Sequence, residues 1–97
     1  MTRRYDALFQ NERKNITLTL TDDDGSSISP SAAYYTVYDS SDNVVIAESE
    51  ASITINVLTA TITSAVTATI AKYKVEWRVR VGSYTYYYST DLYVVDL

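Results

Sequence analysis

Acidic residues are the first groups in this chain that could do chemistry. Asp22, Asp23 and Asp24 precede Gly25, and consecutive carboxylates could supply hard oxygen ligands for calcium. An EF-hand loop, however, alternates its ligands and carries a Glu at its twelfth position, where counting from Asp22 gives Ala33. The flanking segments are also expected to be strands and not helices. The run is therefore interpreted as an acidic β-turn, and no metal site is predicted.

Two residue types that carry much enzyme chemistry do not occur in this chain. It has no histidine and no cysteine, which removes the commonest general base, the commonest zinc ligand and any thiolate nucleophile. Glu48 and Glu50 could form a glycosidase pair, but they stand beside a predicted loop with no aromatic cleft. We therefore expect a protein that is not an enzyme, with no catalytic residue, no metal and no cofactor.

Tyrosines and a charged stripe are better candidates for a functional surface. The chain has ten tyrosines, a residue that supplies contact area at low entropic cost and keeps a polar hydroxyl. Strand alternation separates one C-terminal run into two sets, namely Tyr84, Tyr86 and Tyr88 on one face and Tyr87 on the other. One set is expected to fill the core, which leaves the other exposed. The charged stripe consists of Lys74, Glu76, Arg78 and Arg80. It is interpreted mainly as a solvated sheet face, although its mixed charge also suits a repeated subunit contact.

Strands must position these side chains. Between Tyr73 and Val81 apolar and charged residues alternate without a break, and only a strand sends all the apolar ones to one side. Gly82-Ser83 is a turn dipeptide that leads into a second β-rich run. Apolar residues occupy odd-numbered positions from Ile53 to Val57 and even-numbered positions from Leu58 onward. One continuous strand would place these two sets on opposite faces, so a turn or bulge is required near Asn56–Thr59. The predicted strands are Asn15–Thr21, Ala33–Asp39, Val44–Glu48, Ser52–Asn56, Thr59–Thr63, Lys72–Val81, Ser83–Ser89 and Leu92–Leu97.

Two segments are less regular in this interpretation. Thr90-Asp91 is expected to form a bulge within one bent C-terminal strand. Ser64–Ala71 is either a short helical crossover, with Val66 and Ile70 four residues apart, or an irregular loop.

Seven or eight short strands predict an all-β fold, a single antiparallel β-sandwich of the immunoglobulin-like kind. A small closed barrel is the structural alternative. A length of 97 residues fits one domain, which we place at residues 14–97. The net charge of −4 argues against nucleic-acid binding. No apolar run resembles a signal peptide or is long enough to span a bilayer, so no membrane association is expected.

Residues 1–13 form a separate N-terminal arm in this interpretation. Tyr5, Leu8 and Phe9 could line one side of a single helical turn, but the segment is short and charged. It is either a frayed terminus or an arm that orders against a neighbouring subunit and buries Leu8 and Phe9 there.

The order of strand and turn motifs along the chain resembles that of a known protein family. The order is Thr21-Asp22 with Gly25, then Val37-Tyr38-Asp39-Ser40-Ser41-Asp42, then Tyr73-Lys74-Val75-Glu76-Trp77. It resembles small immunoglobulin-like β-sandwich structural proteins of tailed bacteriophages and prophages, over roughly residues 14–97. In that family the second turn usually contains a glycine, where this chain has Asp42-Asn43.

The resemblance implies a non-enzymatic virion component, such as a tail, baseplate or head–tail protein, made in the cytoplasm of a bacterial host. Its expected partners are other virion proteins or further copies of itself, in a homo-oligomer joined through sheet edges and exposed tyrosines. The alternative is a carbohydrate-binding or adhesive β-sandwich module. The residues expected at an interface are Tyr34, Tyr38, Tyr87, Arg78 and Arg80, together with Tyr5, Leu8 and Phe9 of the arm.

Overall fold

The computed structural model describes residues 3–63, 69 and 71–95, and at residues 3–7 only the course of the backbone. Within these ranges the chain forms eight strands and no helix. The strands are β1 (Arg3–Phe9), β2 (Lys14–Thr19), β3 (Ala32–Asp39), β4 (Val44–Glu50), β5 (Ser52–Thr54), β6 (Val57–Ile62), β7 (Lys72–Val81) and β8 (Tyr84–Val95). The prediction of an all-β chain is confirmed for the part that the structure describes.

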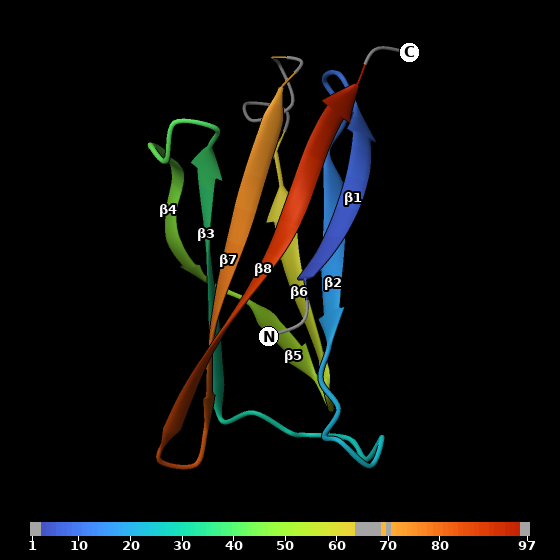
Figure 1. Cartoon of the computed structure of the whole chain (residues 1–97), viewed down its shortest axis with the longest axis vertical. Coiled ribbons are helices and arrows are strands. Elements are labelled where there is room, and N and C mark those ends of the chain that lie inside the picture. Colours follow the sequence, from blue (N-terminus) through green and yellow to red (C-terminus); the bar gives the residue numbers. More distant parts are fainter. Residues whose placement is uncertain (1–2, 64–68, 70, 96–97) are drawn as a thin grey trace.

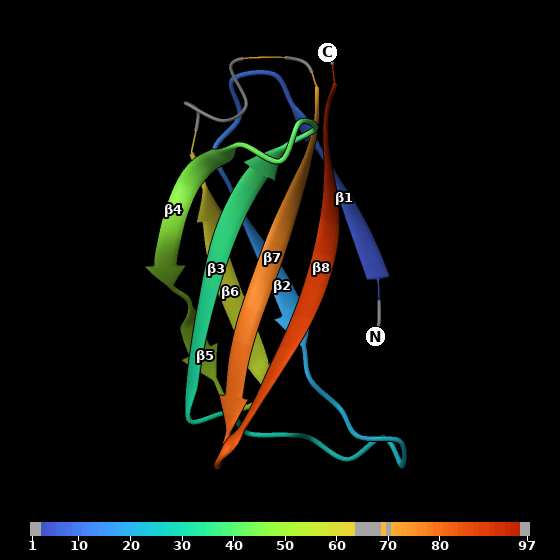
Figure 2. The same cartoon turned by 60° about the vertical axis from the view of Figure 1, so that its left-hand side comes forward.

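The strands form two sheets. One has the order β1-β8-β7-β3-β4 and the other the order β2-β6-β5. Figure 2 shows the five-stranded sheet in front, strongly twisted, with β2 and β6 of the second sheet behind it. The neighbouring strands pair antiparallel except β1, which runs parallel to β8. The expectation of a purely antiparallel fold is therefore wrong at β1.

The core lies between the two sheets, and strand alternation explains its composition. On β7 the side chains of Tyr73, Val75, Trp77 and Val79 are buried, while the charged residues between them are partly exposed. β2 contributes Ile16 and Leu18 in the same way, and β6 contributes Leu58, Ala60 and Ile62. One hydrophobic cluster thus receives side chains from both sheets. Each fully buried aliphatic side chain contributes about 1.5–3 kcal/mol of transfer free energy to folding.

The N-terminal segment differs most from its prediction. Arg3–Phe9 is a strand that pairs with Ser89–Val95 of the same chain, and Figure 1 shows β1 beside β8 and in front of β2. Leu8 is 1% exposed and belongs to the hydrophobic core. The expectation that Leu8 orders against a neighbouring subunit is therefore wrong, because its side chain already has an apolar site between the two sheets. Arg3–Phe9 is part of the β-fold and not an arm outside it.

Two hairpins close through two-residue turns of the same kind. Val81 pairs with Tyr84 across Gly82-Ser83, and Thr54 pairs with Val57 across Ile55-Asn56. In each turn only the first central residue has a positive φ, 62° at Gly82 and 56° at Ile55, which is the pattern of a type II′ turn. The expected turn after β7 is confirmed, and the parity slip near Asn56 is also a turn.

Two aspartate loops share one hydrogen-bonding pattern. Asp22 Oδ1 accepts the backbone N–H groups of Asp24 and Ser26, both at 2.9 Å. Asp39 Oδ1 likewise accepts those of Ser41 and Asn43, both at 2.9 Å. Gly25 and Asp42 occupy equivalent positions with φ of 82° and 64°. Asp42 therefore adopts the left-handed conformation for which a glycine is usual, which aspartate tolerates better than most residues.

The C-terminal strand is more regular than expected. β8 pairs with β7 in one continuous register from Tyr84 to Tyr93, so the predicted bulge at Thr90-Asp91 is wrong. Thr90 points into the core instead, and its Oγ1 accepts the indole N–H of Trp77 at 3.0 Å. The bulges of this sheet lie between β3 and β4, where the register shifts twice. The segment Ser64–Ala71 lies largely outside the described residues, so its predicted crossover or loop is not tested.

Candidate interaction surface

The outer face of the five-stranded sheet, defined as the side turned away from β2, β5 and β6, gathers most of the predicted contact residues. Strand registry places Tyr34 of β3 opposite Arg78 of β7, and Arg78 opposite Tyr87 of β8. Tyr38 lies further along β3 opposite Lys74, and Arg80 lies opposite Ala32 and Thr85. Residues far apart in the sequence thus form one surface, because alternation on three neighbouring strands has the same phase.

Arg78 is held at the centre of this face by the Glu48 carboxylate and the Tyr34 ring. Its Nε and Nη2 donate to the two carboxylate oxygens of Glu48 at 3.0 and 2.9 Å, and its Cζ lies 4.4 Å from the centre of the Tyr34 ring. The hydrogen bond from Arg78 lowers the pKa of the Glu48 carboxyl below its usual range. The same hydrogen bond raises the pKa of Arg78. Bidentate hydrogen bonding to Glu48, together with packing on the Tyr34 ring, fixes the orientation of the otherwise flexible Arg78 side chain.

Lys74 of the stripe and its neighbour Lys72 on β7 are arranged in the same manner. Lys74 Nζ lies 5.2 Å from the centre of the Tyr38 ring and 3.7 Å from Asp42 Oδ1. Lys72 Nζ lies 5.8 Å from the centre of the Tyr93 ring. Three cation–aromatic contacts therefore run across the outer face. The interpretation as a merely solvated stripe understates this order, because each cation packs on a tyrosine of a neighbouring strand.

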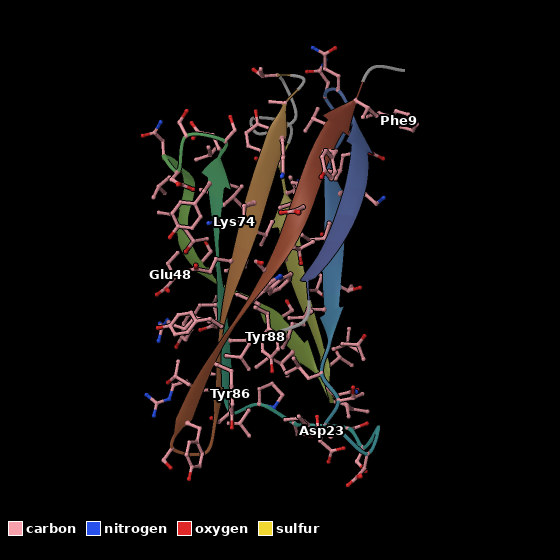
Figure 3. All side chains as sticks on the ribbon, in the orientation of Figure 1. Phe9, Asp23, Glu48, Lys74, Tyr86 and Tyr88 are labelled. Carbon is pink, nitrogen blue, oxygen red and sulfur yellow. The ribbon has the colours of Figure 1, made fainter. Side chains whose placement is uncertain are left out.

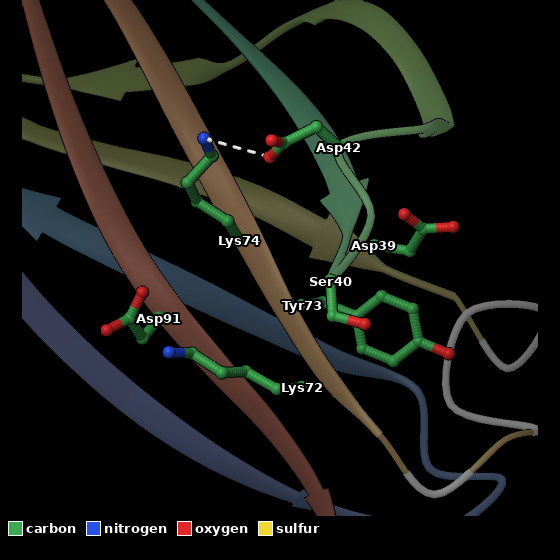
Figure 4. Close-up of a pocket in the computed structure, with 7 residues that line it drawn as sticks. All are labelled: Asp39, Ser40, Asp42, Lys72, Tyr73, Lys74 and Asp91. Atoms are coloured by element: carbon green, nitrogen blue, oxygen red, sulfur yellow. Dashed lines mark ion pairs between the residues drawn. The ribbon is translucent and has the colours of Figure 1, made fainter.

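A shallow hollow of about 290 Å³ ends the outer face at the β3–β4 loop. Figure 4 shows Lys72 and Lys74 on β7, with Asp42 and Asp39 on the loop side and Asp91 on β8. Three carboxylates and two ammonium groups line it, so its charges largely balance. The Asp39 carboxylate accepts hydrogen bonds from its own loop, first from the backbone of Asn43, and these lower its pKa. The hollow thus contains an ion pair between Lys74 and Asp42 and a loop held by the Asp39 carboxylate.

The predicted contact residues of the N-terminal segment do not join this surface as a group. Leu8 is in the core, whereas Phe9 is 47% exposed and stands opposite Val95, which is also exposed. Tyr5 lies opposite Asp91 in the β1–β8 register, and its side chain is outside the described part of the chain. Phe9 therefore remains available for contact at the far end of β1, while Leu8 does not.

A second aromatic group lies on the other side of the β7–β8 hairpin. Tyr84 and Tyr86 point toward the core side of the sheet but are 68% and 46% exposed, and Tyr88 alone packs against the core. The expectation that this set fills the core is thus wrong for Tyr84 and Tyr86. Alternation identifies the face of a side chain, but it does not show how far the opposite sheet extends over that face.

Tyr86 and Tyr88 border a groove at one end of the molecule. The groove has a volume of about 440 Å³ and is lined by Thr21, Asp22, Asp23, Ile28, Val81, Tyr86 and Tyr88. In Figure 3, Tyr86, Tyr88 and Asp23 lie together at this end, between the hairpin and the loop after β2. This groove could not be predicted from the sequence, because its other wall is a loop that is distant from β8 along the chain.

Comparisons with known proteins give no family for this chain: no family model matches it, and a search of curated proteins finds no significant match. Among the described residues, no three His, Cys, Asp or Glu side chains are grouped so that they could hold a metal ion. The described segments also include no helix with the length and apolar character needed to cross a membrane. The surface itself is therefore the basis for a functional proposal.

Proposed function

We propose that this chain is an immunoglobulin-like β-sandwich that serves as a non-enzymatic structural component of a bacteriophage or prophage virion, through contacts between proteins. The observation that carries the functional part is the ordered outer face, where Tyr34, Tyr38 and Tyr87 accompany Arg78 and the lysines of β7. Tyrosine and arginine are enriched at protein interfaces and at their energetic centres. A surface whose side chains are already fixed loses less entropy when a partner binds.

The strand order supports the immunoglobulin-like part of the proposal. If β2 to β8 are equated with strands B, C, C′, D, E, F and G, the smaller sheet reads B-E-D. The larger sheet then reads C′-C-F-G, with β1 added beside G. The chain has no cysteine for the B–F disulfide of antibody domains, and its tryptophan lies on the F equivalent and not on C. Many domains share this architecture without those features.

The decisive experiment measures mass in solution. Size-exclusion chromatography with light scattering, over a wide range of concentration, is expected to show discrete multimers that the double variant Tyr34→Ser/Tyr87→Ser reduces to monomer. Tyr34 is partly exposed and Tyr87 is exposed, so the variant should remain folded, with a melting temperature lowered only by the loss of the Tyr34–Arg78 contact. The control variant is Thr17→Ser on the smaller sheet. A monomer at every concentration that also binds a glycan array would contradict the proposal and favour the carbohydrate-binding module.

The virion assignment requires a test of its own. Particles purified after induction of the encoding bacterium are expected to contain the chain at a fixed ratio to the other structural proteins, as measured by quantitative mass spectrometry. Its presence only in the soluble fraction would contradict a structural role in the particle.

A further inference from the structure

β8 has an edge that β1 covers over only part of its length. β8 runs from Tyr84 to Val95, but β1 stands opposite Ser89–Val95 alone. Among the described residues, no strand lies beside Tyr84–Tyr88 on that side. An uncovered strand edge presents backbone groups that can pair with another chain.

The register identifies which backbone groups face the open edge. Val81 and Tyr84 close the hairpin, so Tyr84, Tyr86 and Tyr88 exchange hydrogen bonds with β7, and the residues between them point the other way. Two bonds further along β8 agree with this phase. Val95 O accepts from Gln10 N on the β1 side at 2.8 Å, while Val94 N donates to Ala71 O on the β7 side at 2.9 Å. The N–H and C=O groups of Thr85 and Tyr87 are thus directed outward along the uncovered edge.

The groove lies directly against this edge. Tyr86 and Tyr88 form one wall, Ile28 and Val81 supply apolar surface, and Asp22 and Asp23 stand on the rim. A smaller recess of about 130 Å³ continues from Tyr88 to Leu18–Thr21 at the end of β2. The region between the edges of the two sheets, which β1 closes further along, is therefore open here.

We propose that this edge and groove bind an extended segment of a partner protein, which adds as a strand beside Thr85 and Tyr87. Apolar side chains at alternate positions of the segment would enter the groove and contact Tyr86, Tyr88 and Ile28, while a lysine or arginine at the end of the segment reaches Asp22 and Asp23. The Asp22 carboxylate is held in place by its two backbone hydrogen bonds. Strand addition of this kind takes its affinity from the main chain and its specificity from pockets for alternate side chains.

The chemistry of the site favours a peptide over a sugar. Tyrosine rings and carboxylates suit a saccharide as well, but a saccharide would leave the directed backbone groups of Thr85 and Tyr87 unused. The acidic rim selects a basic segment, as does the net charge of −4. The inference rests on the proposed role in protein assembly and names the partner chemistry at one edge.

The test uses the full chain and a labelled peptide of sequence KVTVKVT, with binding followed by fluorescence anisotropy. A peptide with the same side chains but N-methylated at the alternate residues whose N–H groups would face Thr85 and Tyr87 cannot pair with this edge, and EVTVEVT reverses the charge. On the protein, Thr85→Pro removes one outward N–H without removing a β7–β8 hydrogen bond, which is where a strand tolerates proline. Thr85→Val is the matched control that keeps the N–H.

The expected result is saturable binding of KVTVKVT that weakens about tenfold or more with the N-methylated peptide and with Thr85→Pro. Thr85→Val should leave the affinity unchanged, and Asp23→Asn should weaken it and reduce its dependence on salt. Equal binding of the N-methylated peptide would overturn strand addition. So would binding of a glycan in place of the peptide, or no binding of KVTVKVT at all.

Failure of this inference can be distinguished from failure of the proposed function. If the chain forms multimers that Tyr34→Ser/Tyr87→Ser disrupts, while KVTVKVT does not bind, the edge proposal is wrong and the outer-face assembly stands. If KVTVKVT binds with the expected pattern but neither multimers nor particle association is found, the edge is a peptide site in a protein of another role.

Discussion

At the scale of the residue, one buried hydrogen bond explains a polar side chain in the core. Trp77 is fully buried, and its indole N–H must find an acceptor there because a buried unpaired donor is costly. Thr90 supplies that acceptor at 3.0 Å and is itself 1% exposed. The threonine that interrupts an otherwise apolar pattern is therefore a required partner of the tryptophan.

Replacing Thr90 with Val is expected to destabilise the protein by about 1–3 kcal/mol, because the shape is retained while the indole N–H loses its acceptor. Urea unfolding followed by circular dichroism, a signal that all the variants share, measures the loss. Trp77→Phe removes the donor, so adding Thr90→Val to it should cost much less than adding it to the natural chain. Equal costs in the two backgrounds would show that the hydrogen bond contributes little.

Ile55 is a second residue whose conformation has a measurable consequence. A β-branched side chain at a φ of 56° is an outlier. The geometry is imposed by Asn56, whose O accepts from Leu20 N at 2.9 Å while its Nδ2 donates to Leu20 O at 3.0 Å. The turn is thus clamped to the end of β2, and Ile55, which is 71% exposed, bears the strain.

Ile55→Gly is expected to raise the free energy of unfolding by about 0.5–1 kcal/mol, since relief of the left-handed penalty exceeds the entropic cost of glycine. Gly82→Ala, at the equivalent position of the other turn, should lower it by about 1 kcal/mol. Thermal melts of both variants provide the measurement. A loss of stability in Ile55→Gly would mean that the side chain makes a compensating contact.

At the scale of the element, β1 shows why only part of the fold could be predicted. The alternation of β7 is local, so its buried and exposed faces follow directly from the sequence. The same is true of the change of parity near Asn56, which requires a turn or a bulge and is a turn in the structure. β1 pairs with a strand more than eighty residues away, and neither its parallel direction nor the core site of Leu8 leaves a local pattern. The groove beside Tyr86 was not predictable for the same reason.

Because β1 is part of the sheet, truncating a side chain of β1 to alanine is expected to change the free energy of unfolding by an amount that depends on the face it occupies. Leu8→Ala is expected to cost about 2–5 kcal/mol, because it leaves a cavity in the core. Phe9→Ala, at the exposed neighbouring position, should change stability by no more than about 0.5 kcal/mol. Chemical denaturation distinguishes the two. Similar costs at both positions would contradict the inward placement of Leu8.

At the scale of the whole molecule, two carboxylates join β4 to the rest of the larger sheet. Asp39 closes the β3–β4 loop through hydrogen bonds from Asn43 and Ser41. Glu48 connects β4 to Arg78 on β7, across the ring of Tyr34. β4 is an edge strand whose pairing with β3 shifts register twice. Both groups stabilise its attachment in their ionised form, in addition to the backbone pairing with β3.

The pKa of each carboxyl is lowered in the folded protein, by the backbone of Asn43 at Asp39 and by Arg78 at Glu48. As the pH falls, the unfolded chain takes up these protons first. The stabilisation is therefore complete above the unfolded pKa values, near pH 4, and is lost as the pH falls through the lower folded values. The midpoint of urea unfolding should be lower at about pH 3 than at about pH 6, and the protection factors of amides in β4, corrected for the intrinsic exchange rate at each pH, should fall before those in β7.

Asp39→Asn and Glu48→Gln should each reduce the acid-dependent part of this loss, and the double variant should reduce it further, because groups that no longer titrate cannot contribute to it. Ser40→Ala changes the same loop without removing a titrating group and should keep the full pH dependence. An unaltered acid loss in the double variant would place the acid sensitivity of the protein elsewhere. A selective loosening of β4 would instead make acid a means to release one edge of the outer face, and with it the contact surface around Arg78, while the core remains folded.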